Sequence, residues 1–115
     1  MSRQNLIWKT NDCKGRIVSL YEQERDHIIE GHPGMGENFV AVKETIEQPD
    51  VIRSSTSHIK REIYSRSSTT ALNIRPPHVL KVVVEFTDNT IGKVVTAFPG
   101  PEKGGRVGDI LYKKS

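Results

Sequence analysis

Apolar residues recur at helical spacing in the first half of the chain. Tyr21 and Ile28 lie seven residues apart and share one side of a helix. Leu20 and His27 have the same spacing and lie on the adjoining row, so His27 borders the buried stripe. This pattern predicts a helix over 20–30. A capping-box pair precedes it and helix-ending residues follow it: Ser19 with Glu22, then Gly31 and Pro33.

A second helical stretch follows a glycine-containing turn. Phe39, Val42 and Ile46 have the spacing that places apolar side chains on one helix face. The pattern predicts a helix over about 37–48. Segment 48–50, Gln-Pro-Asp, ends it because a residue before proline disfavours the helical conformation.

Beyond this point the pattern alternates, which is typical of strands. We expect strands over 50–53, 58–66 and 109–112, and an earlier one over 16–20, whereas the polar stretch 9–15 is typical of a loop. Alternation within 58–66 predicts two sets on opposite faces: Ile59, Arg61 and Ile63 on one, and Lys60, Glu62 and Tyr64 on the other.

The clearest strand signal is a hairpin over 79–98. A two-residue loop at Asp88 and Asn89 would place Lys81 opposite Thr96. One face would then carry Leu80, Val82, Val84, Phe86, Ile91, Val95 and Ala97. The other face would carry Lys81, Val83, Glu85, Val94, Thr96 and Phe98.

The order of two helices followed by antiparallel strands predicts a single α+β domain over 1–115, with a core of about 16–98. We expect the helices to cover one face of the sheet and to leave the other partly open. The chain has no apolar run of about 20 residues and no signal-peptide core, so a cytoplasmic location is expected.

The net charge and the cysteine content exclude only a few kinds of binding partner and site. The net charge of +3 and the pI near 9.1 suit a polyanionic partner without requiring one. The single cysteine, Cys13, excludes an intramolecular disulfide and a multi-thiolate metal site. His27 and His32 are five residues apart, not the four of a helical zinc pair, so no metal or other cofactor is expected. Segment 104–108 lacks the ending of a phosphate-binding loop, although Lys103 and Arg106 suit contact with a nucleic-acid backbone.

The open face of the sheet is the expected site for chemistry on RNA. Cleavage of RNA without a metal needs proton transfer at the 2′-hydroxyl and cations for the charge that develops on the phosphate. Histidine suits the first task, and lysine and arginine suit the second. The residues that meet there on this hypothesis are Lys60, Tyr64, Lys81 and Thr96, with His27 or His32 from the helix end.

Each of these residues also has a structural interpretation. A histidine at a stripe border, such as His27, is more often a hydrogen-bonded structural residue, and His32 can cap the helix end. Thr96 is a β-branched residue of the kind that is common in strands. Lys81 lies between apolar neighbours, and because burying an unpaired ammonium group is costly, its side chain must either lie on an open face or pair with a phosphate.

Taken in order, several segments resemble a known group of small nucleases: His27-Ile28, His32-Pro33, Gln48-Pro49-Asp50-Val51-Ile52, Arg61-Glu62-Ile63-Tyr64, Lys81-Val82-Val83-Val84 and Val94-Val95-Thr96-Ala97-Phe98. The chain over about 16–98 resembles the phage-associated branch of the barnase–EndoU–colicin–RelE superfamily. The resemblance implies two N-terminal helices packed on a four-stranded antiparallel sheet. It also implies metal-independent RNA cleavage of the toxin type, for which an inhibitor or antitoxin protein is an expected partner. The positions to which it points are His27, His32, Arg61, Tyr64 and Thr96; Lys81 is added from the hairpin register.

The sequence thus predicts an endoribonuclease with His27 or His32 as general acid or base. Lys81 and Arg61 would stabilise phosphate charge, and Tyr64 and Thr96 would position the substrate. Further RNA contacts are expected from Arg53, Lys60, Lys103 and Arg106. Since Arg61 and Tyr64 have opposite parity, at most one of them is expected to face the site. The alternative function is a non-catalytic domain of the same fold that binds RNA or a protein.

Overall fold

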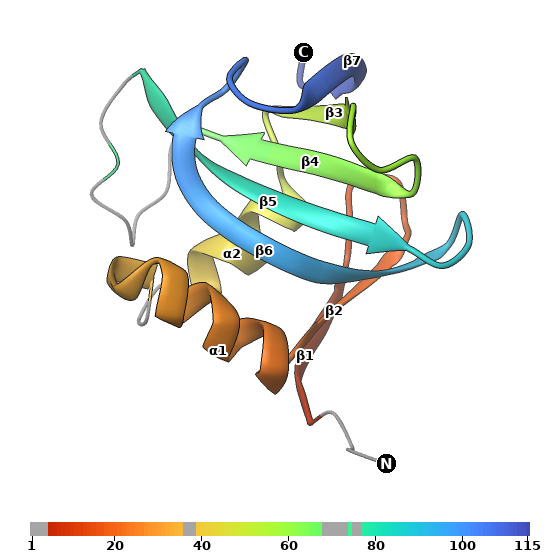
Figure 1. Cartoon of the computed structure of the whole chain (residues 1–115). Helices are drawn as coiled ribbons and strands as arrows, with labels where there is room; N and C mark the ends of the chain where they lie inside the picture. Colours follow the sequence, from red (N-terminus) through yellow and green to blue (C-terminus); the bar gives the residue numbers. More distant parts are fainter. Residues whose placement is uncertain (1–4, 36–38, 68–73, 75–76) are drawn as a thin grey trace.

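The computed structural model describes residues 5–35, 39–67, 74 and 77–115, which form an α+β fold (Figure 1). Two α-helices lie in this part of the chain, α1 (Glu22–Gly31) and α2 (Phe39–Glu47), with a 3-10 turn at Pro33–Met35 between them. The seven strands are β1 (Leu6–Asn11), β2 (Ile17–Tyr21), β3 (Val51–Ser55), β4 (Arg61–Arg66), β5 (His78–Phe86), β6 (Ile91–Pro101) and β7 (Val107–Lys113). No helix in the described ranges is long and apolar enough to cross a membrane.

The strands form one mixed sheet in the order β1-β2-β6-β5-β4-β3-β7. β2 pairs with β6 in parallel and all other neighbours are antiparallel. The expectation of a four-stranded antiparallel sheet is therefore wrong. The additional strands include β1, whose residues 9–11 were expected in a loop because they are polar. Trp8, partly buried against the core, anchors this strand.

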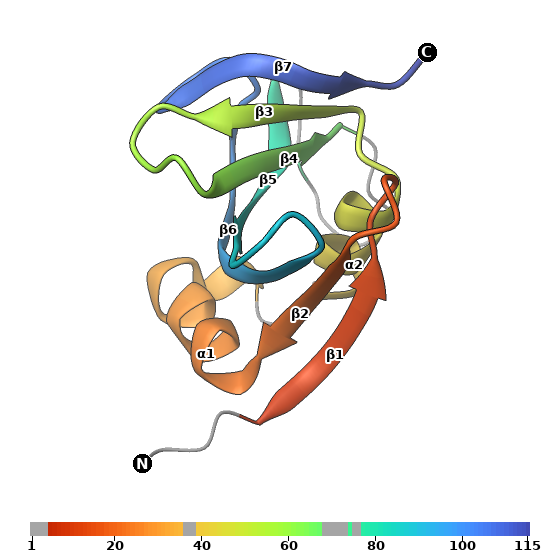
Figure 2. The same ribbon diagram turned by 90° about the vertical axis from the view of Figure 1, so that its right-hand side faces the viewer.

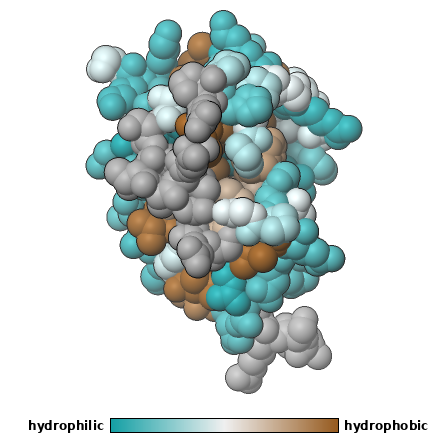
Figure 3. Space-filling view, turned by 90° about the vertical axis from the view of Figure 1, so that its left-hand side faces the viewer, coloured by the Kyte–Doolittle hydropathy of each residue, from teal (hydrophilic) through white to brown (hydrophobic). Residues whose placement is uncertain are grey.

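Both helices lie on the same side of a strongly curved sheet (Figure 1). α1 packs on β6 and β2, and α2 packs on β5, β1 and β4. Figure 2 shows β1 and β2 at a steep angle to β3, β4 and β7. On the face shown in Figure 3, the coloured surface is mainly hydrophilic, with apolar residues in small groups. The helices thus cover one face of the central strands, as expected.

The core lies between this face and the helices. From the helices it includes Ile28, Ala41, Val42 and Ile46, and from β5 it includes Leu80, Val82, Val84 and Phe86. These four strand residues form the apolar face expected from alternation. The opposite face of β5 carries Lys81, Val83 and Glu85, also as expected from alternation.

The start of α1 differs from the expected capping box. Ser19 is buried in β2, and Tyr21 is the N-cap residue without a side-chain cap bond. Instead, the backbone N–H of Glu22 donates to the carbonyl oxygen of Asn5 at 2.8 Å, and the Asn5 side chain donates to the Glu22 carboxylate at 3.0 Å. Asn5, the residue before β1, therefore provides the hydrogen bonds at the start of α1. The local Ser19–Glu22 pair does not determine where the helix begins.

The β5–β6 hairpin has a longer turn than expected. Thr87 N–H donates to the Ile91 carbonyl oxygen, and Phe86 pairs with Gly92 instead of Ile91. This one-residue difference buries Val94 and leaves Ile91 48% exposed, contrary to expectation. The register then shifts between Val83 and Val84, where Val95 is the extra residue.

The extra residue Val95 forms a β-bulge. Beyond the bulge, the side chains of β6 point to the expected faces of the sheet, but they lie opposite other residues of β5 than expected. Ala97 is buried in the core, while Thr96 and Phe98 face the other way. Lys81 lies opposite Phe98, and Thr96 lies opposite Val83, so the expected Lys81–Thr96 pair is wrong.

Gly92 is required by the packing of this hairpin. A Cβ atom at Gly92 would lie 2.8 Å from side-chain atoms of both Phe86 and Val84. We expect Gly92→Ala to lower the free energy of unfolding by about 1–3 kcal/mol, because the core side chains must shift. Urea unfolding followed by circular dichroism measures this. Gly31→Ala is the matched control, since nothing lies within 4 Å of a Cβ there. Equal unfolding midpoints for the two variants would contradict the prediction.

Candidate functional site

A hollow of about 450 Å³ lies on the sheet face that points away from the helix-packed core. We call it the open-face pocket. Its strand-borne lining comes from β3, β4, β5 and β6 and the residues after β3: Ser55, Ser57, Arg61, Ile63, Lys81, Val83, Thr96 and Phe98. The remaining wall is the segment after Phe98: Pro99, Gly100, Pro101, Gly104, Gly105, Arg106 and Val107. This volume is in the range of small-ligand sites.

Glycines shape the wall between β6 and β7. A Cβ at Gly104 would lie 2.5 Å from the Pro101 ring, and the Gly104 N–H donates to the Pro101 carbonyl oxygen at 3.1 Å. Gly105 has φ +79°, which other residues rarely adopt. The wall is therefore a tightly folded turn whose shape depends on these two glycines.

Lys81 attaches this wall to the sheet. Its side chain is 3% exposed, and its Nζ donates to the carbonyl oxygens of Pro101 at 3.0 Å and Gly104 at 2.7 Å. Burial lowers the pKa of Lys81. The negative charge of Glu102 partly offsets this decrease, and the positive charge of Arg53 adds to it. An ammonium group has three donors, so one remains for a ligand in the pocket.

Two arginines contribute charge at and near the pocket. Arg61 donates from Nε to Glu85 at 3.0 Å, which lowers the pKa of that carboxyl. The two terminal nitrogens of Arg61 have no partner among the described residues. Arg106 lines the pocket and is exposed.

Arg53 is not among the residues that line the pocket and bonds the neighbouring wall instead. It donates to Glu102 at 2.7 Å and to the Gly108 carbonyl oxygen at 3.0 Å, and thus joins β3 to the wall and to β7. Lys103 is exposed on the same turn but does not line the pocket.

His32 lies at the edge of the site through Phe98. The two rings are stacked with centroids 5.9 Å apart, and the Lys81 Nζ lies 5.7 Å from the centre of the Phe98 ring. His27 is exposed on α1, and no contact with the pocket is seen in the described residues. The structure therefore places Arg61, Lys81, Thr96 and Arg106 in the pocket lining, His32 beside it against Phe98, and His27 outside it.

Two expected members of the open face lie elsewhere. Tyr64 is fully buried on the helix-covered face, so its expected position on the open face is wrong. Lys60 precedes β4 and lines a different hollow with Arg16 and Glu62. Ile59, expected inside a strand, is 100% exposed before β4. β4 begins three residues later than expected. Along this strand, Tyr64 and Arg61 point to opposite faces of the sheet.

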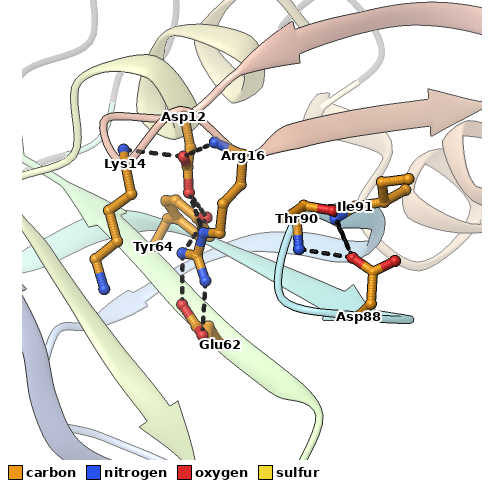
Figure 4. A network of polar contacts seen from close by, with 8 residues as sticks. All are labelled: Asp12, Lys14, Arg16, Glu62, Tyr64, Asp88, Thr90 and Ile91. Carbon is orange, nitrogen blue, oxygen red and sulfur yellow. Dashed lines mark hydrogen bonds and ion pairs between the residues drawn. The ribbon is translucent and has the colours of Figure 1, made fainter.

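Tyr64 belongs to a polar network that is not predicted from the sequence (Figure 4). Its hydroxyl donates to Asp12 Oδ2 at 2.5 Å. Arg16 donates to the same Asp12 oxygen at 2.9 Å and to both Glu62 oxygens at 2.9 and 2.8 Å. The Arg16 guanidinium also lies 4.1 Å from the centre of the Phe86 ring. The network connects the β1–β2 turn to β4.

The pKa values of this network follow from burial and its hydrogen bonds. Burial by itself would raise the pKa of Asp12, but hydrogen bonds from Tyr64 and Arg16 outweigh it and hold the pKa below its usual value. Burial and the bond to Asp12 raise the pKa of Tyr64. The signal for this network is the polar turn itself, where Asp12 Oδ1 accepts from the backbone N–H groups of Lys14 and Arg16.

Cys13 lies exposed in the same turn. Desolvation and the negative charge of Asp12 raise the pKa of its thiol. An activated cysteine nucleophile has a lowered pKa, so the environment of Cys13 is the reverse of one that favours catalysis.

Comparisons with family models, curated proteins and solved structures find no significant match to this chain. Within the described ranges, no group of three or more His, Cys, Asp or Glu side chains is placed to hold a metal ion. The class defined by the structure is an α+β domain with a cation-lined pocket on the open face of its sheet.

Proposed function

We propose that this protein binds RNA at the open-face pocket and cleaves it without a metal ion. The observation that supports this is that Arg61, Lys81 and Arg106 line one hollow of the uncovered sheet face. Phosphates attract clustered lysine and arginine, and a partly closed pocket strengthens that attraction.

The proposed reaction is attack of a 2′-oxygen on the neighbouring phosphorus, with departure of the 5′-oxygen of the next nucleotide. Negative charge increases on the non-bridging phosphate oxygens during this step. The third N–H of Lys81 and the terminal N–H groups of Arg61 are the donors that would stabilise it. His32, beside Phe98, is the group assigned to proton transfer, because imidazole exchanges protons near neutral pH.

RNA binding without cleavage is the second candidate function. It is favoured by the pocket lining, because none of the described residues that line it is a histidine, aspartate or glutamate. A site that only holds RNA needs cations and an aromatic platform but no group for proton transfer.

One experiment separates these functions. Purified protein is incubated with single-stranded RNA in EDTA, and both fragment formation and fluorescence anisotropy are measured. Discrete fragments support the endoribonuclease. Saturable binding without fragments supports the binding module. About three phosphate contacts predict that log K falls with log salt at a slope of about −2. Absence of both cleavage and binding would exclude both functions.

A further inference from the structure

The open-face pocket combines an apolar lining with cations. Its apolar side chains are Ile63, Val83, Phe98, Pro99, Pro101 and Val107. A surface that binds only the phosphate backbone needs cations and no apolar hollow. The lining therefore indicates that a flat, largely apolar group enters the pocket while charged groups remain near Arg61 and Arg106.

We propose that the open-face pocket receives one unpaired nucleobase of the RNA. This inference rests on the proposed function and specifies the substrate as single-stranded RNA or a base turned out of a duplex. A base inside a duplex is stacked on both sides and paired at its edge, so it has no free face to offer. The volume of about 450 Å³ accommodates a ligand of nucleoside size.

Phe98 is the stacking platform for this base. It lies on β6 opposite Lys81, and its contact with the His32 ring restrains its orientation. A base on this ring lies near the Lys81 ammonium, which has one donor left for an acceptor on the base or on its phosphate.

Hydroxyl groups lie in the strand-borne lining of the pocket. Ser55, Ser57 and Thr96 line it. Ser55 Oγ accepts from the backbone N–H groups of Ser57 and His58 and lies 3.1 Å from Ser57 Oγ. The Thr96 hydroxyl has no partner among the described residues, so it can donate to or accept from the edges of different bases. The pocket therefore selects for an unpaired base more than for one particular base.

The test compares two seven-nucleotide oligomers of equal charge by fluorescence anisotropy. One carries uracil at every position and the other has abasic riboses throughout. All 2′-positions are methylated in both, which removes the attacking hydroxyl and prevents cleavage. We expect the uracil oligomer to bind about tenfold more tightly, the effect typical of stacking one base on an aromatic side chain.

Protein variants show whether the base enters this pocket. Val83→Phe fills the pocket, and Phe98→Leu removes the aromatic platform. In both variants the preference for uracil should fall to less than about twofold, because the base and the pocket then no longer contact each other. Val40→Phe makes the same size change on α2, where Val40 is 72% exposed, and should keep the tenfold preference. Thermal unfolding of each variant checks that it is folded.

The outcomes separate this inference from the proposed function. Equal, salt-sensitive binding of both oligomers overturns the base pocket and leaves RNA binding intact. A uracil preference that persists in folded Val83→Phe and Phe98→Leu places the base elsewhere and also overturns it. Base-dependent binding by a protein that never cleaves unmodified RNA supports the pocket and excludes the endoribonuclease. No binding of either oligomer overturns both proposals.

Discussion

Replacing Asp12 by alanine is expected to lower the free energy of unfolding by about 3–5 kcal/mol, as for loss of one partner of a buried ion pair. The Asp12 side chain is fully buried and accepts from Tyr64, from the Arg16 side chain and from two backbone N–H groups. Its removal leaves the buried Tyr64 hydroxyl without its acceptor and Arg16 with only Glu62 as an anionic partner. Urea unfolding followed by circular dichroism gives the change directly.

Asp26→Ala is the matched control for this prediction. Asp26 is an exposed carboxylate of α1 that pairs with Arg25 at 3.2 Å, and surface pairs contribute little. If Asp12→Ala lowers the unfolding midpoint no more than Asp26→Ala, the network does not stabilise the fold.

Acidification provides a second measurement on Asp12. Its pKa in the folded protein lies below the usual 3.8, so its stabilising effect is complete above about pH 5. This contribution is lost as the pH falls below that value through the folded-state pKa. Asp12→Asn should therefore show a smaller loss of stability than the parent protein between pH 4 and pH 2.

The largest effects on activity are expected at Lys81 and Arg61. Lys81→Met and Arg61→Gln should each lower kcat/KM for RNA cleavage by about 10²–10³-fold, as for loss of one preorganised donor to a charged transition state. Lys81 also holds the pocket wall through Pro101 and Gly104, whereas Arg61 makes no bond to that wall in the described structure. A deficit in Arg61→Gln consequently reports on phosphate contact without a change in the wall.

Arg25→Gln removes the same charge from α1 and does not touch the pocket. It should retain cleavage within about twofold of the parent, apart from a small long-range effect of charge. Unchanged cleavage by folded Lys81→Met and Arg61→Gln would show that the open-face pocket is not the cleavage site.

Part of the candidate site could be recognised from alternation in β5. Lys81 stands between Leu80 and Val82, so any arrangement that buries those two residues places Lys81 on the opposite face. Alternation also separates Arg61 from Tyr64, which is confirmed, but the expectation that Tyr64 lies on the face of Lys81 is wrong, because Arg61 is the one that lines the pocket. That depended on pairing Ser65 with Lys81 and Arg61 with Glu85, which a single strand does not specify.

The other parts of the site depend on residues distant in sequence. His32 reaches the site only because α1 packs on β6, which brings its ring against Phe98. The pocket wall exists because the chain after Phe98 folds back onto Lys81 and continues into β7, which pairs with β3. Neither arrangement leaves a repeating pattern in the sequence.

The two helices, the main strands and the apolar face of β5 could be predicted from the amino-acid sequence, because helical and alternating periodicity depend on neighbouring residues. The strand order, the edge strand β1, the pairing of β7 with β3 and the contact of Asp12 with Tyr64 follow from the tertiary structure alone. It also decided the facing of Ile91 and Val94, because one extra turn residue reverses every side chain until the bulge at Val95 corrects it. Contacts between distant segments set these features, and their energies are not encoded in any one segment.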